Sequence, residues 1–154
     1  MDRSQLLKKI DRAWEAFTAS YAGLSDDELM QPGVTGNWSV KDIIAHVACW
    51  EEEALTNLPI ILAGEKPPKY SHMYGGIDAF NAQRTEQARK LSLSEVLQRQ
   101  EETHRRLIEF IQRAPEYQIT TETRFRRRLR LDTYRHYPEH TEAIQKWRER
   151  RSAG

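Results

Sequence analysis

The sequence contains very little cysteine and no long hydrophobic run. Cys49 is the only cysteine among 154 residues, so a disulfide within the chain is excluded. The longest apolar run extends only from Leu58 to Ala63, far short of the ~20 residues that a membrane-spanning helix needs. The first residues carry no apolar signal region. We therefore expect a cytoplasmic protein without a membrane segment.

The sequence also lacks a strong net charge, internal repeats and strand–helix alternation. A formal net charge of +1 provides no general attraction to nucleic acid. A glycine-rich phosphate-binding loop is absent as well, which argues against nucleotide binding. Charged residues make up 31% and apolar residues 38% of the chain, which is typical of a helix-rich soluble protein. The length suits a single domain, residues 1–154, with its own core.

What the sequence does contain is a series of apolar residues at helical spacing. In the first segment they recur at three- and four-residue steps, at Leu6, Leu7, Ile10, Ala13, Trp14, Phe17 and Tyr21. Ser39 with Asp42 predicts the start of a second long helix, and Ser92 with Glu95 predicts the start of another. The last helix is expected to begin between Arg126 and Asp132 and to run to about Arg151.

Prolines, glycines and polar clusters mark the expected connections. Residues 77–90 read as a short helix, 65–76 as a long loop, and 117–123 as a loop or a short extended piece. Four amphipathic helices with long connections predict an all-α fold, a four-helix bundle. Sites for ligands and metals are commonly built in the cores of such bundles.

Three histidines are candidate metal ligands. His136 and His140 are four residues apart, so a helix would present both imidazoles on one face, where two nitrogens can meet one ion. His46 lies seven residues after the Ser39 cap, on an apolar helix face. From the spacing alone, a hydrogen-bonded histidine in or at the end of the core is the more common case for each of the three. The spacing alone leaves both interpretations open.

Residues 38–51 (WSVKDIIAHVACWE) resemble the second-helix signature of the DinB-like four-helix bundles, with a closer resemblance to the ClbS/DfsB family. Residues 77–82, 92–97 and 133–140 resemble further segments of that family, so the similarity covers nearly the whole chain. The resemblance implies an up-down-down-up bundle. It also implies that one divalent ion, with zinc or nickel as the expected metals, is shared by His46, His136 and His140.

The resemblance carries further expectations about the site. Together with the direction in which they face, it implies that Trp50, Asp78, Asn81 and Tyr137 form the wall of a pocket. Asp132 departs from the family, since many relatives have Asn at that position. A homodimer formed through helix faces is an expectation from the superfamily alone.

Cys49 and His104 are expected to be core residues, and His72 a solvent-exposed one.

The sequence is compatible with three functions. The first is a metal-dependent enzyme that performs hydrolysis or thiol transfer on an electrophilic metabolite or xenobiotic, with Glu51, Glu139 or Asp132 as base or as a partner of a ligating histidine. The second keeps the pocket without a metal and, as the family resemblance implies, protects against a reactive DNA-damaging metabolite by binding it or opening its ring. The catalytic residues stay unassigned in both, and the expected partner is a small molecule.

The third function is nucleic-acid binding through a run of arginines, Arg124, Arg126, Arg127, Arg128, Arg130 and Arg135. Phe125 is the only aromatic residue between Arg124 and Arg130, which is poor for base stacking. The net charge is also far from that of a typical nucleic-acid-binding domain. We therefore interpret the run as a solvated, partly interfacial segment and do not expect a nucleic-acid partner.

Overall fold

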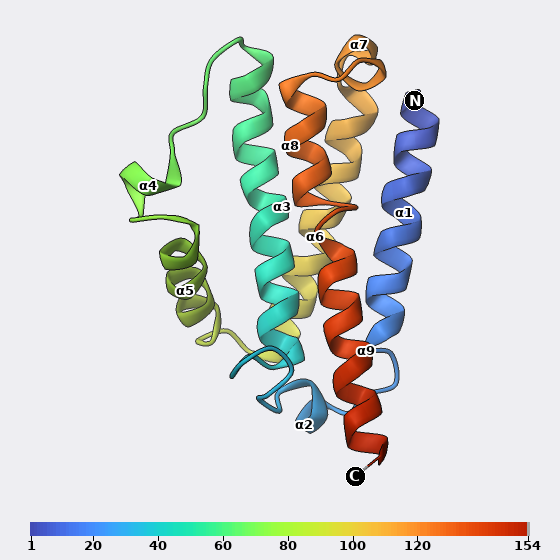
Figure 1. The fold of residues 1–154 in the computed structure, drawn as a ribbon, viewed down its shortest axis with the longest axis vertical. Coiled ribbons are helices and arrows are strands. Elements are labelled where there is room, and N and C mark those ends of the chain that lie inside the picture. The colour runs from blue at the N-terminus through green and yellow to red at the C-terminus, as the bar shows by residue number, and fades with distance from the viewer. Residues whose placement is uncertain (154) are drawn as a thin grey trace.

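The long helices expected from the apolar periodicity form the body of the computed structural model, which describes residues 1–153 (Figure 1). They are α1 (Arg3–Ser20), α3 (Val40–Leu62), α6 (Leu93–Arg113) and the consecutive pair α8 (Arg124–Asp132) and α9 (Tyr137–Ala153). Within the described residues the only β-structure is one isolated bridge, so the all-α prediction is confirmed. In Figure 1, α1 and the α8–α9 pair run in one direction, and α3 and α6 run in the other.

Four short helices connect or cover the long ones. They are α2 (Asp26–Leu29), α4 (Tyr70–Met73), α5 (Ile77–Ala88) and α7 (Glu116–Thr120). The expectation of a loop or extended piece over residues 117–123 was wrong in its first part, because α7 occupies it. The hydroxyls of Thr120 and Thr121 donate to the carbonyls of Glu116 and Tyr117, which stabilises this single turn despite the β-branched residues.

Reciprocal side-chain caps fix the starts of the principal helices. In each of four capping boxes, the first residue accepts from the backbone N–H of the third helical residue, whose side chain accepts from the N-cap backbone. The pairs are Asp2 with Gln5, Ser25 with Glu28, Ser39 with Asp42, and Ser92 with Glu95. Each box satisfies two backbone donors that the helix itself leaves without a partner. The helix starts predicted at Ser39 and Ser92 are therefore found where the sequence indicates them.

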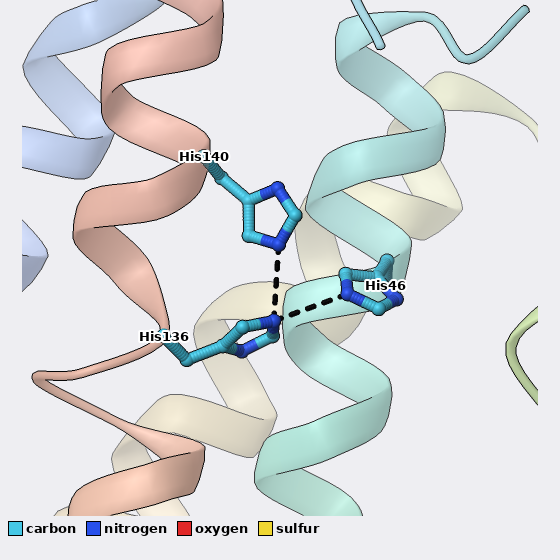
Figure 2. Close-up of side chains that lie close together, drawn as sticks. All are labelled: His46, His136 and His140. Atoms are coloured by element: carbon cyan, nitrogen blue, oxygen red, sulfur yellow. Dashed lines mark hydrogen bonds between the residues drawn. The ribbon is translucent and has the colours of Figure 1, made fainter. Parts of the chain in front are cut away.

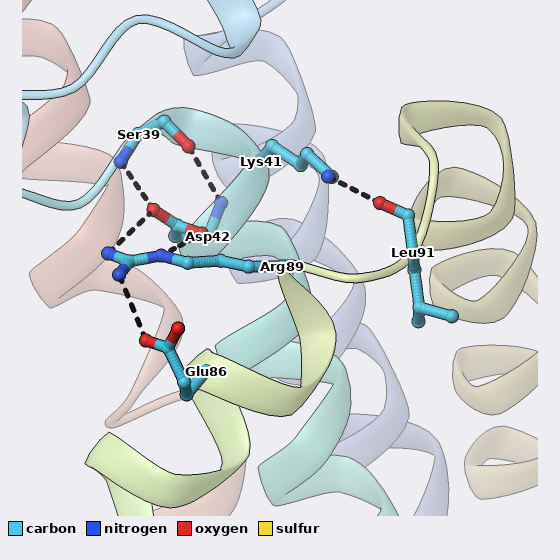
Figure 3. Close-up of polar contacts among 6 residues, drawn as sticks. All are labelled: Ser39, Lys41, Asp42, Glu86, Arg89 and Leu91. Atoms are coloured by element: carbon cyan, nitrogen blue, oxygen red, sulfur yellow. Dashed lines mark hydrogen bonds and ion pairs between the residues drawn. The ribbon is translucent and has the colours of Figure 1, made fainter.

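The cap of α3 also anchors the end of α5. Asp42 accepts hydrogen bonds from the guanidinium of Arg89 at 3.4 Å, in addition to its bond with the backbone of Ser39 (Figure 3). Nearby, the ammonium of Lys41 donates to the carbonyl of Leu91. These contacts hold the segment between α5 and α6 against the first turn of α3.

We expect Ser39→Ala to destabilise the protein by about 0.5–2 kcal/mol, because the first turn of the longest helix loses its cap. Urea denaturation followed by circular dichroism measures the change. The matched control is Ser25→Ala, which removes the same kind of cap from the four-residue α2 and should cost less. Equal effects of the two substitutions would contradict the special weight given to the start of α3.

The fourth helical segment of the bundle, the α8–α9 pair, is interrupted. We predicted one last helix that begins between residues 126 and 132, but α8 begins at Arg124 and ends at Asp132, and α9 begins only at Tyr137. Pro138 explains the break, because it has no N–H and its ring would clash with the carbonyl four residues earlier in a continuous helix. The Thr133 hydroxyl donates to the Leu129 carbonyl at 2.6 Å and helps to end α8.

The apolar interior has two parts. The main core fills the space between the long helices and includes the fully buried Phe17, Phe125 and Tyr137. A second, small cluster of Cys49, Trp50 and Phe80 lies between α3 and α5. It attaches α5 to the outer side of the bundle (Figure 1). None of the described helices combines the length and the apolar character needed to cross a membrane.

Candidate functional site

The three candidate histidines come together in space. The Nε2 atom of His136 lies 3.1 Å from Nε2 of His46 and 3.0 Å from Nε2 of His140 (Figure 2). One ligand atom from each residue lies within 4.8 Å of the others. His46 projects from α3 and His140 from α9, while His136 belongs to the four-residue break before α9. The expected grouping is present, although His136 does not share a continuous helix with His140.

Burial keeps these imidazoles neutral. It is the main cause of a pKa of about 2 for His46, about 3 for His136 and about 4 for His140, and the proximity of the other imidazoles contributes to the first two values. Desolvation has this direction because it disfavours the charged form. Neutral imidazoles carry a lone pair that can bind a metal ion.

Hydrogen bonding alone leaves this cluster poorly satisfied. An imidazole nitrogen carries either one proton or one lone pair, so Nε2 of His136 can form only one good hydrogen bond. It nevertheless faces two other nitrogens at hydrogen-bonding distance. Its Nδ1 atom is buried without a hydrogen-bond partner among residues 1–153. Three neutral imidazoles whose nitrogen lone pairs converge in this way fit a divalent ion, for which imidazole is a preferred ligand.

The histidines form one side of a pocket of about 510 Å³. It is lined by Trp38, His46, Trp50, Tyr70, Ile77, Asn81, Arg128, Leu131, Asp132, His136, Glu139 and His140. A groove of about 700 Å³ between α1 and α6 is larger, but its lining is mainly charged and polar and contains no aromatic ring. The pocket at the histidines is the place where aromatic and titratable groups converge, as is typical of binding sites.

The structure separates the four residues expected in the pocket wall. Trp50 and Asn81 line the pocket and are joined by a hydrogen bond from the indole Nε1 to the amide Oδ1 at 2.9 Å. Asp78 is exposed on α5, outside the lining residues. Tyr137 is fully buried beneath the pocket. The direction in which a residue faces on its helix was not enough to place these residues. Tyr137 lies in the core behind the pocket, and Asp78 lies on the outer face of α5.

The three acids considered as base or orienting group have different surroundings. Glu51 is fully buried, and its Oε2 accepts from the hydroxyl of Tyr137 at 2.6 Å and from Nδ1 of His104 at 2.7 Å. Asp132 lines the pocket and accepts from Arg128 at 2.7 Å, and burial raises its pKa to about 6. Glu139 is exposed and also lines the pocket. Glu51 is thus a buried structural partner, and His104 is partly buried at the edge of the core, where its ring stacks on Trp14.

Several lining residues, among them Arg128 and Tyr70, were not singled out from the sequence as pocket residues. Arg128 donates through Nε to Asp132 and through Nη2 to the hydroxyl of Tyr70, both at 2.7 Å. Its guanidinium carbon also lies 5.9 Å from the ring centre of Trp50 and 5.8 Å from that of Tyr70. The spacing of Arg128 and Asp132, one helical turn apart, was the available signal.

Much of the arginine run is engaged in ion pairs and backbone contacts. Glu122 pairs with Arg130 at 2.5 Å and with Arg126 at 3.9 Å. Arg127 donates to the carbonyl of Glu122, and Arg124 donates to that of Glu65, each at 3.3 Å. These contacts neutralise part of the charge and favour the structural interpretation of the run.

Cys49 and His72 lie where they were expected. Cys49 is buried in the small cluster beside Trp50, and burial raises the pKa of its thiol to about 12, which makes the reactive thiolate scarce. His72 is exposed on α4 and is not part of the pocket lining.

The family model described as the DinB superfamily matches residues 9–150. None of the curated proteins matches the chain.

Solved structures share the fold at low sequence identity. The colibactin self-resistance protein ClbS, solved in complex with a dsDNA, is 16% identical, with a TM-score of 0.77 and coverage of 94% of each chain. DfsB, described as a sibling lethal factor precursor, is 17% identical, with a TM-score of 0.79 and coverage of 98% of this chain and 97% of that one. A Streptococcus pneumoniae protein is 13% identical, with a TM-score of 0.79 and coverage of 97% and 91%.

Proposed function

Because this chain belongs to the DinB superfamily, we propose that it acts on a small electrophilic molecule at a divalent ion held by His46, His136 and His140. The observation that carries the proposal is the convergence of three neutral imidazoles at one side of a pocket, those of His46 and His140 buried and that of His136 partly buried. The expected ions are zinc and nickel, both of which accept imidazole ligands.

The proposed chemistry is hydrolysis or thiol transfer. An ion bound by three histidines supplies Lewis acidity and keeps coordination positions open, which suits attack on an electrophilic carbon at neutral pH. Of the three acids considered, Glu139 is the best placed to accept a proton, because it lines the pocket next to His140 and is exposed. Asp132 positions Arg128, and Glu51 holds the hydroxyl of Tyr137.

A second candidate is a protein that binds a reactive metabolite without a metal. The aromatic lining of the pocket supports it, because Trp38, Trp50 and Tyr70 provide a binding surface that needs no ion. The likeness in fold to ClbS, a colibactin self-resistance protein, is compatible with either candidate.

Metal titration tests the proposal. We expect isothermal calorimetry of the metal-free protein, prepared without a histidine tag, to show one zinc or nickel ion per chain. His140→Ala should abolish this stoichiometric binding, because only two ligating nitrogens remain. His72→Ala is the matched control, since it removes an exposed histidine outside the cluster and should bind metal like the wild type.

Weak metal binding by the wild type would contradict the proposal. If the wild type and His140→Ala bind zinc and nickel equally weakly, while both remain helical by circular dichroism, the three histidines form a structural cluster. The metal-free pocket is then the better account of the function.

A further inference from the structure

The wall of the pocket away from the histidines carries two free hydrogen-bond donors, beside the carboxylate of Asp132. The first is the amide of Asn81. The indole nitrogen of Trp50 can only donate, so it must face the amide oxygen of Asn81, as the 2.9 Å contact shows. The NH₂ group of Asn81 therefore faces away from Trp50. It has no hydrogen-bond partner among residues 1–153, and it is not one of the buried unsatisfied atoms.

The second donor is the guanidinium of Arg128. Its Nε and Nη2 atoms are held by Asp132 and Tyr70, which fix the plane of the group. Within the described chain, Nη1 makes no hydrogen bond and is not counted among the buried unsatisfied atoms, so it stays accessible. A guanidinium fixed in this way is well suited to bind a carboxylate, because little rotational freedom remains to be lost.

The rest of this wall is apolar. The rings of Trp50 and Tyr70 lie with their centres 5.3 Å apart, and both line the pocket. At its mouth, the side chains of Ile77 and Leu131 are 53% and 63% exposed, although both are large and aliphatic. Exposed apolar residues around a pocket are typical of contacts with a ligand. They favour a ligand with a hydrophobic body.

We propose that the ligand of this pocket is a small organic acid with an apolar or aromatic body, whose carboxylate is bound by Arg128 and Asn81. The body lies against Trp50 and Tyr70 and between Ile77 and Leu131, and its far end points toward the three histidines. The inference deepens the proposed function, on which it rests for the reaction, by naming the class of substrate. The recognition of the acid depends on residues outside the histidine cluster.

Matched acid and amide probes test this proposal in the metal-free protein, at a pH at which the histidines are neutral. Trp38 and Trp50 line the pocket, so tryptophan fluorescence reports binding. We expect phenylacetate to bind about tenfold more tightly than phenylacetamide, because only the acid forms charge-assisted hydrogen bonds with Arg128. Inorganic phosphate should bind more weakly than phenylacetate, because it lacks the apolar body.

An isosteric variant identifies the wall that recognises the acid. Asn81→Asp keeps the acceptor for Trp50 but replaces the free donor with a negative oxygen, so the preference for the acid over the amide should disappear. Gln83→Glu adds the same charge at an exposed position of α5 outside the pocket lining, and it should keep the preference.

The outcomes separate this inference from the proposed function. Equal affinity for acid and amide, no binding of the acid at millimolar concentrations, or an unchanged preference in Asn81→Asp overturns the inference, whatever the metal titration gives. Phosphate binding as tight as that of phenylacetate contradicts the apolar body. A preference for the acid in a protein that binds no zinc or nickel supports the inference while the metal-dependent function fails.

Discussion

Acidification is expected to destabilise the metal-free protein steeply below the ordinary pKa of histidine. His46, His136 and His140 are neutral in the folded chain because burial lowers their pKa values to about 2, 3 and 4. In the unfolded chain each titrates near pH ~6.5. Between these values the unfolded state binds more protons than the folded one, so the free energy of unfolding falls as the pH falls.

The size of the effect follows from the number of protons. Each histidine contributes a loss of up to about 1.4 kcal/mol per pH unit below its unfolded pKa. Asp132 opposes this, because burial raises its pKa in the folded state to about 6 and protonation there stabilises the fold as the pH falls. The net loss from about pH 7.5 to about pH 5 is roughly 4 kcal/mol, a large share of the stability of a typical domain.

Urea unfolding at a series of pH values measures this loss. Replacing all three histidines with Gln should remove the loss over this range and leave only the smaller, opposite effect of Asp132. His72→Gln is the control and should leave the profile unchanged, because His72 is exposed. A wild-type unfolding midpoint that does not move over this range would show that the cluster is not held neutral by burial.

Phe80→Ala is expected to release α5 from the bundle without unfolding the rest. Phe80 is fully buried, and its ring centre lies 5.3 Å from that of Trp50 and 4.9 Å from that of Tyr74. Removing a buried Phe side chain costs about 3–5 kcal/mol. This cost falls on the small cluster of Cys49, Trp50 and Phe80, which is separate from the main core. The expected result is a local opening of α4 and most of α5, while the contacts of Arg89 and Leu91 with the first turn of α3 remain.

Hydrogen exchange resolved by peptide measures the opening. Amides of α5 should exchange far faster in Phe80→Ala, while those of α1 and α6 stay protected. Phe17→Ala is the matched control, because Phe17 is equally buried but belongs to the main core, so its loss should weaken protection throughout the bundle. If both substitutions weaken protection uniformly, α5 is not an independently opening unit.

The sequence predicted the helix starts best, because each one is encoded locally. Ser39 with Asp42 and Ser92 with Glu95 form their caps within four residues, so no distant contact is needed to place them. The interruption between α8 and α9 was harder to predict. Pro138 signals an irregularity, but the position at which α8 ends also depends on the bond of Thr133 to Leu129.

The three histidines of the candidate site were predictable, but only part of its wall was, at Trp50 and Asn81. The grouping of His46, His136 and His140 came from the family resemblance, since spacing within one helix says nothing about a residue on another. The placement of Asp78 on the outer face of α5 and of Tyr137 beneath the pocket depends on tertiary packing. Arg128 could not be separated from its neighbours in the arginine run, because Tyr70, the partner that fixes Nη2, is 58 residues away.

The break between α8 and α9 sets the reach of the pocket. In one unbroken helix, the twelve steps from Arg128 to His140 would fix a rise of about 18 Å and a constant rotation between the two side chains. Here residues 133–136 interrupt the helix, so the span from the guanidinium to the imidazoles is determined by this joint and not by helical geometry. Residues 133–136 therefore set the length of ligand that can extend from Arg128 to the histidines. Inserting or deleting a residue there would change which molecules fit, while α8 and α9 keep their packing.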